Sequence, residues 1–350
     1  MSKVRVGIVG CGNIAKTHAT ALSALSEGEL AAACDVDEAR ARAFAAQFGA
    51  PNAYTDADAM LKSGAVDAII VCTPHPLHAP VVVAAAEAGV HVLCEKPISD
   101  KVSEAYRMAE AADRAGIVFS VVFQRRWWPA CQRIRQAIDD GKLGRLTLGE
   151  SVSKLWRSQE YFASDAWRGK WATEGGGALM NQAVHTVDMF QWFMGPAVEV
   201  VGRWAKLRTG DYIDVEDTAV ATVVFASGAL GTILAATTIN PGFGFRVTVH
   251  GENGATASVW ENPEGQQGVN DVWTIPGEES LRAEWEQEDR DKPGFPYFHQ
   301  LQLQDFLQAI RDNRPPAVAG AEGIKSLEII EAIYHSSRTG DPVSLPMARA

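Results

Sequence analysis

The stretch Val4-Arg5-Val6-Gly7-Ile8-Val9-Gly10-Cys11-Gly12-Asn13-Ile14-Ala15 decides the fold of this chain. It begins with an apolar, β-branched run, which predicts a buried strand over residues 4–9. Two glycines follow, and an amphipathic pattern then predicts a helix over residues 14–26. A strand that turns through glycines directly into a helix is the first half of a βαβ unit, so we expect a parallel α/β arrangement.

The small residues of this turn each have a physical reason. Gly10 permits a tight turn, Gly12 lets the backbone approach a pyrophosphate, and Ala15 lets helix and strand pack closely. The helix N-terminus would face the anion. Asp35 ends the next predicted strand, about 20 residues further on, where a carboxylate accepts hydrogen bonds from an adenosine ribose. The pattern predicts an NAD site and outweighs the alternative, a glycine turn beside a surface aspartate.

Short β-branched runs alternate with alanine-rich helical patterns up to about residue 123. Strict alternation of this kind implies a doubly wound parallel sheet. We therefore predict an NAD-binding Rossmann domain over residues 1–124. Its further strands are expected over residues 30–34, 68–72, 91–94 and 119–123, and its further helices over residues 38–48, 80–88 and 100–115.

The pattern changes after Gln124. A helix is predicted over residues 129–140, and the runs 217–225 and 229–238 flank Ala226-Ser227-Gly228 as in an antiparallel hairpin. Residues 254–291 are polar and glycine-rich, and two helices follow over residues 297–311 and 321–337. Residues 125–350 are therefore predicted to form an α/β domain with a large, mainly antiparallel open sheet.

Composition limits the classes of function. A length of 350 residues suits two domains, and 47% apolar with 21% charged residues is typical of a globular protein. The mean hydropathy of −0.08 argues against a membrane protein. The apolar N-terminal run breaks at Gly10, before a signal peptide could form, so we expect a cytoplasmic protein. A net charge of −11, with no basic cluster longer than Arg125-Arg126, disfavours a nucleic-acid partner.

The five cysteines predict reduced thiols rather than a metal site. Their number is odd and none has CxxC spacing. A zinc site needs close pairs of cysteine and histidine, and His75 and His78 have only Cys72 nearby. We therefore expect no bound metal.

Glu95-Lys96-Pro97 follows directly on a predicted strand. Ligands of open α/β sheets bind outside the carboxyl ends of the strands, which would bring Lys96 to the cofactor crevice. There its ammonium could exchange a proton with a substrate hydroxyl, because a positive nicotinamide and partial burial lower the pKa of a lysine. The alternative is a solvated loop lysine.

A glycine triplet, residues 175–177, precedes a largely apolar helical pattern. On that helix Asn181, His185 and Asp188 stand at i, i+4 and i+7, which places them on one face. Polar groups on an apolar helix must be hydrogen-bonded or must face a ligand. The site interpretation therefore competes with that of a satisfied core histidine.

Aromatic and arginine side chains crowd two loops near these motifs. Tyr161, Trp167, Arg168 and Trp171 precede the glycine triplet, and Arg125-Arg126-Trp127-Trp128 follows the last Rossmann strand. Aromatic rings stack on sugar faces, and arginines bind hydroxyls or phosphates. Ordinary loop packing and surface charge is an equally simple interpretation for each of them.

Together these residues resemble the Gfo/Idh/MocA family, the relatives of glucose-fructose oxidoreductase and inositol dehydrogenase. The likeness covers nearly the whole chain, through residues 10–15, 73–78, 95–97, 175–188 and 299–346. The resemblance implies a dehydrogenase or ketoreductase that transfers hydride between a nicotinamide, NAD rather than NADP, and a ring carbon that bears a hydroxyl. The substrate would be a sugar, nucleotide sugar, glycoside or cyclitol. A homodimer or homotetramer packed through the open sheet of the second domain is also implied.

The resemblance also implies roles for individual residues. His185 would lie by the reacting carbinol, and Lys96 would bridge its hydroxyl to the nicotinamide ribose as the second catalytic group. Substrate contacts are expected from Asn181, Arg126, Tyr161, Trp167 and Asp188. Cofactor contacts are expected from Gly10, Gly12, Asn13, Ile14, Asp35, Thr73, Pro74, His78, Glu95, Lys96, Gln124 and Arg168.

Asn181 departs from the family pattern, because many members carry Asp at this position. An aspartate could raise the basicity of a neighbouring histidine, whereas the neutral amide can only position the substrate or the ring. Lys96 would then carry more of the proton transfer. Family members with this Asn resemble enzymes that act on pyranosides or nucleotide sugars, often at the 3-hydroxyl.

Two other classes of function fit the same motifs. An NAD-dependent glycosidase or lyase would oxidise a ring hydroxyl transiently and return the hydride, so NADH would not accumulate. A redox-sensing binding protein would have a dead site, which the presence of both Lys96 and His185 argues against. The substrate and the direction of the reaction stay open at this point.

We predict that Asp35 makes the protein select NAD over NADP. A carboxylate that meets a 2′-phosphate in a partly desolvated pocket suffers like-charge repulsion. Fluorescence titration should therefore show tighter binding of NADH than of NADPH, and replacing Asp35 should relax the preference. Tighter NADPH binding by the unmodified protein would refute the assignment, and Arg40, five residues on, would be the first residue to examine.

Overall fold

The computed structural model describes residues 3–347, and the chain divides into two compact units. The first unit runs up to Gln124 and also contains Phe295–Ile324. The second contains Arg125–Gly294 and the residues from Lys325 onward, so the division falls inside helix α12 (Gly320–Thr339). All of residues 125–350 were predicted to belong to the second domain. The segment 295–324 differs from that prediction because its helix packs on the first unit.

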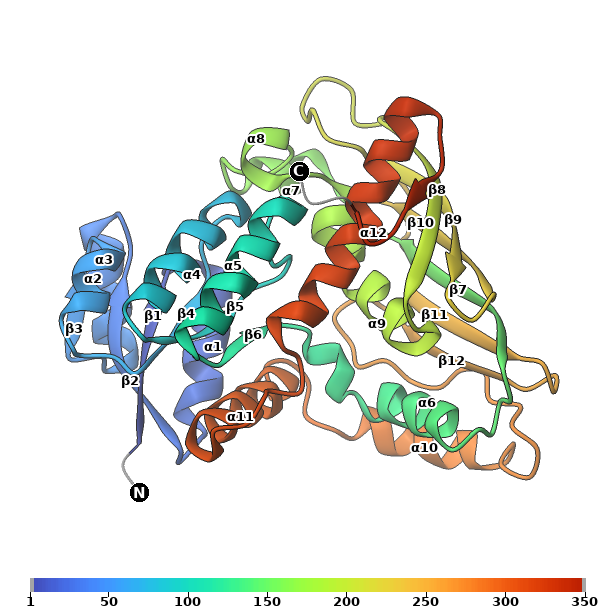
Figure 1. Ribbon diagram of the computed structural model, residues 1–350, viewed down its shortest axis with the longest axis horizontal. Helices are drawn as coiled ribbons and strands as arrows, with labels where there is room; N and C mark the ends of the chain where they lie inside the picture. The colour runs from blue at the N-terminus through green and yellow to red at the C-terminus, as the bar shows by residue number, and fades with distance from the viewer. Residues whose placement is uncertain (1–2, 348–350) are drawn as a thin grey trace. The chain divides into compact units, whose positions relative to one another are not determined.

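A six-stranded parallel sheet forms the centre of the first unit, in the order β3-β2-β1-β4-β5-β6 (Figure 1). This is the doubly wound order of a Rossmann fold, and it confirms the predicted fold class. The strands are β1 (Val4–Val9), β2 (Gly28–Cys34), β3 (Asn52–Tyr54), β4 (Ala68–Val71), β5 (His91–Cys94) and β6 (Phe119–Val121).

Helices connect these strands, and most lie where the sequence predicts them. The sequence analysis missed the short elements β3 and α3, because three to six residues are too few to show a period. The helices are α1 (Asn13–Ser23), α2 (Glu38–Phe48), α3 (Ala57–Lys62), η1 (His75–Leu77), α4 (His78–Glu87), α5 (Val102–Ala115) and α11 (Tyr297–Asp312), and η2 (Gln124–Trp127) follows β6.

The core of the first unit explains why α11 belongs to it. Val6 and Ile8 of β1 pack in one apolar cluster with Leu22 of α1 and with Phe306 and Leu307 of α11. All five side chains are at most 2% exposed. Burial of side chains of this size contributes roughly 1.5–3 kcal/mol each. In Figure 1, α11 lies beside α1, and the two helices are in contact.

The second unit is built on a seven-stranded sheet in the order β12-β11-β7-β10-β9-β8-β13. Only β7 and β10 pair in parallel, so the predicted mainly antiparallel sheet is confirmed. The predicted hairpin is also present, with Leu230 opposite Val224. The strands are β7 (Leu146–Lys154), β8 (Ala197–Ala205), β9 (Thr218–Phe225), β10 (Leu230–Ala236), β11 (Gly244–Gly251), β12 (Thr256–Glu261) and β13 (Val343–Ser344).

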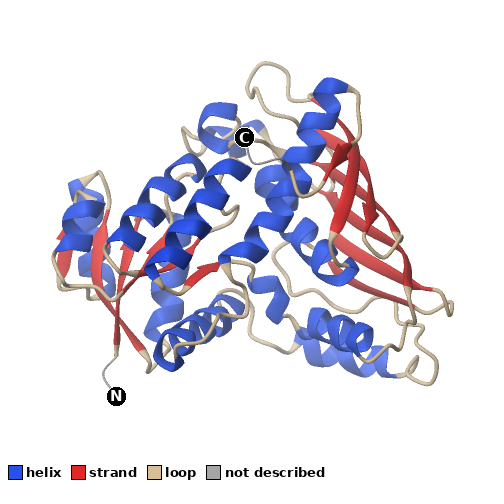
Figure 2. Ribbon diagram, in the orientation of Figure 1, coloured by secondary structure: helices blue, strands red, loops and turns tan. Residues whose placement is uncertain are grey.

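Helices of the second unit gather on one face of this sheet (Figure 2). Phe190 of α9 fits against Gly149 and Gly231, where added Cβ atoms would come within 2.8 Å and 2.4 Å of its ring. Among the residues that the structure describes, no helix covers the opposite face. The helices are α6 (Pro129–Asp139), α7 (Gln159–Ala163), α8 (Trp171–Glu174), α9 (Val184–Met194), α10 (Leu281–Arg290), most of α12, and the π-helix η3 (Ala178–Ala183).

Two features of this unit were not predicted. Helix α10 lies within the polar segment that showed only weak strand signals. The helix was not predicted, because its polar side chains leave little apolar periodicity. It is held in place by Arg133 of α6, which binds Asp289 at 2.7 Å. The π-helix η3 was expected to be regular α-helix, since no pattern of single residues distinguishes the two.

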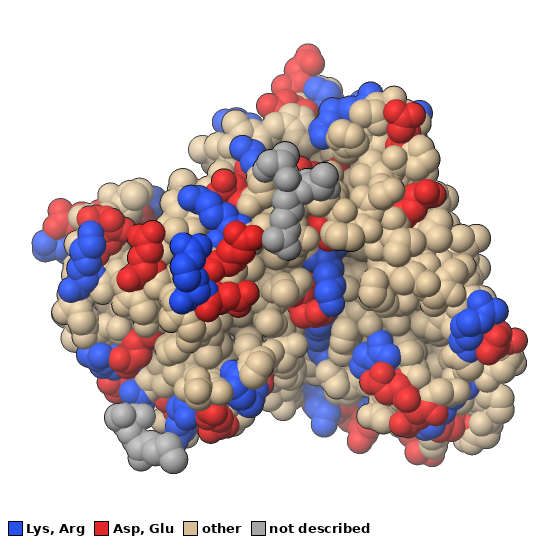
Figure 3. Space-filling model, viewed as in Figure 1, with Lys and Arg blue, Asp and Glu red and all other residues tan. Residues whose placement is uncertain are grey.

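Charged residues of both signs are interspersed on the face shown in Figure 3, and Lys and Arg form no continuous patch there. Within residues 3–347, no helix combines the length and the apolar character needed to cross a membrane.

The first βα turn depends on one glycine more than on the other. Gly10 has φ +90°, and a Cβ atom there would lie 2.7 Å from the Cys72 carbonyl oxygen. Gly12 has φ −79°, and a Cβ atom would find nothing within 4 Å. Of these two glycines, the fold therefore requires only Gly10.

Gly10→Ala is expected to lower the free energy of unfolding by roughly 2–4 kcal/mol. This value adds the cost of a left-handed conformation for alanine to the cost of displacing the Cys72 backbone. Gly12→Ala should change it by less than about 1 kcal/mol, because only a weaker N-cap results. Urea denaturation of both variants measures the difference, and equal losses would contradict this account.

Candidate active site

The parallel sheet of the first unit brings most of the predicted cofactor residues to one edge. Val9 pairs with Cys34 and with Val71, and Val71 pairs in turn with Cys94. The strands therefore end side by side, and the residues that follow them gather at the carboxyl edge, where open α/β sheets bind ligands. These residues are Gly10, Gly12, Asn13, Ile14, Asp35, Thr73, Pro74, Glu95, Lys96 and Gln124.

The start of α1 fits a pyrophosphate. Gly12 is the N-cap and makes no side-chain capping hydrogen bond, and α1 carries no acidic residue in its first turn. The N–H groups of a first helical turn need acceptors, and the helix dipole favours an anion at this end. The open space at Gly12 leaves room for a ligand to approach the backbone.

Asp35 is buried and fixes the glycine turn. Its Oδ2 accepts a hydrogen bond from the Cys11 N–H at 2.9 Å, and its Oδ1 accepts one from the Asp37 N–H at 3.0 Å. Arg40 lies 3.2 Å from the same carboxylate with about half of its side chain exposed. The carboxylate therefore stands at the end of β2, where a ribose would bind, already oriented by backbone donors.

Two exposed apolar residues at this edge were not predicted. Val36, directly after Asp35, is 92% exposed, and Leu77 of η1 is 51% exposed. Two buried polar atoms at the same edge, Thr73 Oγ1 and Gln124 Oε1, have no hydrogen-bond partner among the described residues. Buried polar atoms are normally paired, so these fit a cofactor that supplies the partners and covers the apolar side chains.

His78 braces two loops instead of contacting a cofactor. Its ring nitrogens lie 2.9 Å from the Thr73 carbonyl oxygen and 3.0 Å from that of Pro97. The side chain is 0% exposed, and burial lowers the pKa of the ring despite these hydrogen bonds. His78 was predicted to contact the cofactor, and in this structure the protein itself encloses the ring. His78 ties the loop after β4 to the loop that carries Lys96.

Glu95 holds the backbone of Lys96. Its Oε2 accepts a hydrogen bond from the Lys96 N–H at 3.0 Å, and its Oε1 lies 2.7 Å from Nε2 of the buried His18. Burial raises the pKa of Glu95, but the hydrogen bond from His18 and the charges of His18, Lys96 and His299 outweigh it and lower the pKa to about 2. Glu95 is thus a fixed anion. Sequence reasoning missed His18 and His299, which lie on α1 and α11.

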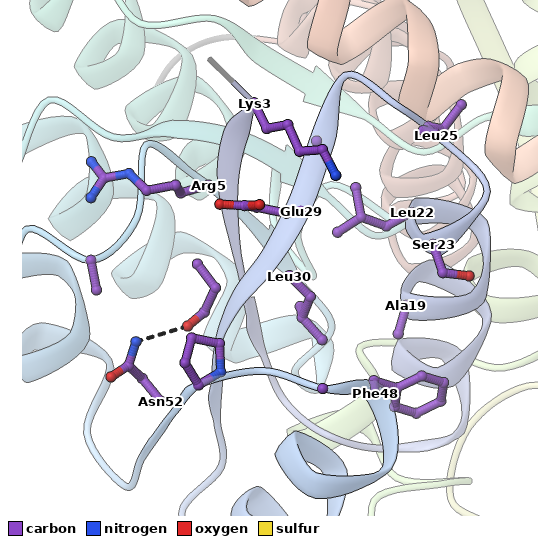
Figure 4. Close-up of a pocket in the computed structure, with 15 residues that line it drawn as sticks. Lys3, Arg5, Ala19, Leu22, Ser23, Leu25, Glu29, Leu30, Phe48 and Asn52 are labelled. Carbon is purple, nitrogen blue, oxygen red and sulfur yellow. Dashed lines mark hydrogen bonds between the residues drawn. The ribbon is translucent and has the colours of Figure 1, made fainter.

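A hollow in the first unit lies at the other edge of the sheet. It has a volume of about 570 Å³ and is lined by Leu22, Leu30 and Phe48 under Lys3 and Arg5 (Figure 4). These residues surround the amino ends of β1 and β2. None of the predicted site residues lines it, so we do not assign the cofactor to this hollow.

In the second unit, η3 and α9 carry the polar residues that were predicted on one helix face. Asn181 lies on η3 and donates from Nδ2 to Glu174 Oε1 at 2.5 Å, whereas His185 and Asp188 lie on α9. All three are at most 9% exposed. The wider turn of η3 alters the i, i+4 relation between Asn181 and His185, and π-helical turns are frequent at functional sites.

Asp188 and Arg126, which were both predicted to contact a substrate, bind each other. Arg126 Nε donates to Asp188 Oδ2 at 2.9 Å, and its second terminal nitrogen donates to Oδ1 at 2.6 Å. The two residues are 4% and 1% exposed, and the guanidinium also lies over Trp192. A buried charge needs a paired partner, so both side chains are committed to the interior.

The loop before the glycine triplet brings three of its predicted site residues together, namely Tyr161, Trp167 and Arg168. Arg168 donates to Tyr161 Oη at 2.6 Å, and its guanidinium lies 4.6 Å and 4.7 Å from the Tyr161 and Trp167 ring centres. Gln182 of η3 also donates to Tyr161 Oη, at 2.7 Å. Arg157, which sequence reasoning missed, donates to Gln182 and lies over the Tyr161 ring. This cluster places a polar, aromatic surface next to η3.

Both halves of the chain match known family descriptions. Residues 4–123 match "Oxidoreductase family, NAD-binding Rossmann fold", and residues 135–345 match "Oxidoreductase family, C-terminal alpha/beta domain" of the same family. Myo-inositol 2-dehydrogenase of Thermotoga maritima is 28% identical over 93% of each chain.

Two solved structures are more similar in sequence. The WlbA dehydrogenase of Bordetella pertussis, in complex with NADH and UDP-GlcNAcA, has a TM-score of 0.90 and 33% identity over 99% of each chain. The WlbA dehydrogenase of Chromobacterium violaceum, bound to the same ligands, has a TM-score of 0.88 and 32% identity over 99% of this chain and 97% of that chain.

These relatives are dehydrogenases, so the predicted class of reaction, hydride transfer between NAD and a carbon that bears a hydroxyl, is confirmed. The glycosidase or lyase alternative is not favoured. The chain therefore belongs to the Gfo/Idh/MocA family, and it is an NAD-dependent oxidoreductase.

Proposed function

We propose that this enzyme transfers hydride between NAD and a ring carbon of a nucleotide-linked sugar. The observation that carries the proposal is the likeness to the two WlbA dehydrogenases, at 32–33% identity over 99% of this chain, against 28% for the inositol dehydrogenase. Asn181 supports the proposal, because family members with Asn at this position resemble enzymes that act on pyranosides or nucleotide sugars.

Lys96 is proposed as the proton-transfer group. When NAD is bound, it supplies the acceptor or donor of the hydride. In the direction of oxidation, the neutral Lys96 amine would take the proton of the substrate hydroxyl, while the carbon that bears this hydroxyl gives up its hydride to NAD⁺. In the direction of reduction, the Lys96 ammonium would return the proton to the oxygen. Glu95 holds the Lys96 backbone, and His78 braces the adjoining Pro97 carbonyl, so the loop is fixed from both sides.

His185 is proposed to bind the substrate hydroxyl from its place on α9. Asn181 would orient the sugar with it, because Glu174 fixes the amide nitrogen of Asn181. Gly12, Asn13 and Ile14 are proposed to bind the pyrophosphate, Asp35 the adenosine ribose, and Thr73, Pro74 and Gln124 the nicotinamide half. Trp167 and Tyr161 are proposed to contact the substrate, and Arg168 is proposed to contact the cofactor. We also propose that the enzyme works in the cytoplasm.

The proposal predicts the order of substrates and the effect of two variants. With NAD⁺, kcat/KM for UDP-GlcNAcA should exceed that for myo-inositol and levoglucosan by at least about tenfold, or ~1.4 kcal/mol of transition-state binding.

Lys96→Met should lower kcat on the preferred substrate by roughly two to four powers of ten, the usual share of general acid–base catalysis. NADH binding should survive in that variant.

His185→Asn serves as the second test in the same assay. A substrate role predicts an unchanged melting temperature with kcat/KM lowered by at least roughly tenfold. A large loss of melting temperature with near-normal kcat/KM would instead show a packed core histidine. A higher kcat/KM for myo-inositol than for UDP-GlcNAcA would refute the proposed substrate class.

We further propose that a second copy of this chain covers the open face of the seven-stranded sheet. Strand pairing sets Val224, Leu230 and Leu148 in one row across β9, β10 and β7. Leu148 is 41% exposed and Leu230 is 55% exposed. In Figure 3 the surface near β8 and β9 carries few charges. An exposed apolar face of this kind marks an association surface, which fits a homodimer or homotetramer.

Leu230→Glu is expected to reduce the molar mass of the particle in solution, because it would bury an unpaired charge in the interface. Light scattering after gel filtration measures this mass. Leu207→Glu is the control, since Leu207 is 73% exposed but lies in the loop between β8 and β9. Equal masses for the wild type and Leu230→Glu would argue against this interface.

A further inference from the structure

Glu216 holds the start of the π-helix η3 with three hydrogen bonds to consecutive residues. Its Oε2 accepts from the Gly177 N–H at 2.8 Å, and its Oε1 accepts from the Leu179 N–H at 2.8 Å. Its main-chain oxygen accepts from the Ala178 N–H between them at 3.1 Å. The N-cap residue of η3, Gly177, supplies no side-chain capping bond, so a residue before β9 caps this helix instead.

Tyr334 of α12 completes the arrangement by donating its hydroxyl to Glu216 Oε1 at 2.8 Å. Both side chains are almost fully buried, at 0% exposed for Glu216 and 3% for Tyr334. The glycines are necessary for this fit. A Cβ atom on Gly177 would lie 2.1 Å from the Glu216 main-chain oxygen, and one on Gly176 would lie 2.2 Å from the Tyr334 hydroxyl oxygen.

The segment that Glu216 holds carries the proposed substrate residues. Asn181 lies on η3 itself, and α9 follows directly with His185 as its second residue. The main chain links them further, since the Asn181 N–H donates to the Gly177 carbonyl oxygen at 3.1 Å. A shift of the Gly177 backbone would therefore displace Asn181 directly.

We propose that Glu216 is a positioning residue of the active site, which fixes η3 through Gly177 and Leu179 and so sets the orientation of Asn181 and His185. The inference rests on the proposed substrate role of these two residues. Glu216 itself contacts neither substrate nor cofactor in this account. It acts through the backbone, as a carboxylate that replaces the missing helical cap.

The backbone hydrogen bonds favour the ionised form of Glu216. Each carboxylate oxygen accepts from donors, so a proton on either oxygen would face an N–H or O–H group. Burial raises the pKa of Glu216 to about 7, although its hydrogen bonds lower it. Tyr334 is the titratable group that contacts it, and Glu174 adds a negative charge near Tyr334. The cap should therefore weaken as the pH falls below about 7.

Glu216→Gln tests the proposal, because an amide keeps one acceptor oxygen and turns a donor toward the other backbone N–H. We expect faster hydrogen exchange at Gly177 and Leu179 and a kcat lowered by at least about tenfold, with NADH affinity within about twofold of the wild type. The protection of these amides should rise between pH 6 and pH 8 in the wild type and stay flat in the variant.

Asp217→Asn is the matched control. Asp217 is also a fully buried carboxylate, but it accepts from the backbone of Leu207, Arg208 and Thr209, away from η3. Its variant should leave exchange at Gly177 and Leu179 unchanged and kcat within about threefold of the wild type. Equal effects of both variants on exchange and on kcat would overturn the proposal, because a general loss of stability would explain them.

Tyr334→Phe covers the case in which Glu216→Gln does not fold. It removes one donor and leaves both backbone contacts, so we expect the same changes in exchange and kcat at a smaller size. Unchanged exchange at Gly177 and Leu179 in the folded variants would refute the positioning role. Faster exchange with an unchanged kcat would support the capping role of Glu216 but refute the substrate role of Asn181 and His185. This outcome separates the proposal for Glu216 from the proposed function.

Discussion

Buried carboxylates that accept hydrogen bonds from loop backbones hold both units in their working form. A loop cannot satisfy its own N–H groups as a helix or sheet does, and a carboxylate offers two strong acceptor oxygens. The same interaction fixes the glycine turn after β1, the loop of Lys96, the loop before α8, the start of η3 and the loop before β9. The carboxylates are those of Asp35, Glu95, Glu174, Glu216 and Asp217.

The parts of the fold that depend on local pattern could be predicted from the sequence. Strands of the Rossmann sheet are continuous apolar runs, and the glycine turn with Asp35 follows from the chemistry of dinucleotide binding. The hairpin of β9 and β10 follows from alternation around Gly228, which has φ +82°. The placement of α11 could not be predicted, because its contacts with α1 join residues far apart in the chain.

The predicted site shows the same limit at the level of side chains. Asp188 and Arg126 were predicted to contact a substrate. The sequence does not show that they pair with each other, because 62 positions separate them. Asn181 and His185 were placed on one regular helix, since sequence periodicity does not reveal the π-turn between them. The physical rule, that a buried polar group needs a partner, holds for Asp188 and Arg126, which pair with each other. It does not decide between a ligand and another side chain.

Glu95 and Glu216 show how the same interaction can have opposite effects on stability. Glu95 has a hydrogen bond from His18 and the basic side chains of Lys96 and His299 near it, so its pKa falls to about 2. Its contribution to stability is lost only as the pH drops from 4.5 toward that value. Glu216 has backbone donors and a tyrosine but no cation among its main influences, so burial prevails and its pKa rises to about 7.

The folded state therefore binds the Glu216 proton more tightly than the unfolded chain does, and the stability of the protein falls as the pH rises from 4.5 to about 7. Each effect is on the order of 3 kcal/mol, with opposite sign. A buried glutamine at position 216 would avoid this cost. It could not accept from Gly177 and Leu179 together, and only the carboxylate holds the backbone of η3 at both points.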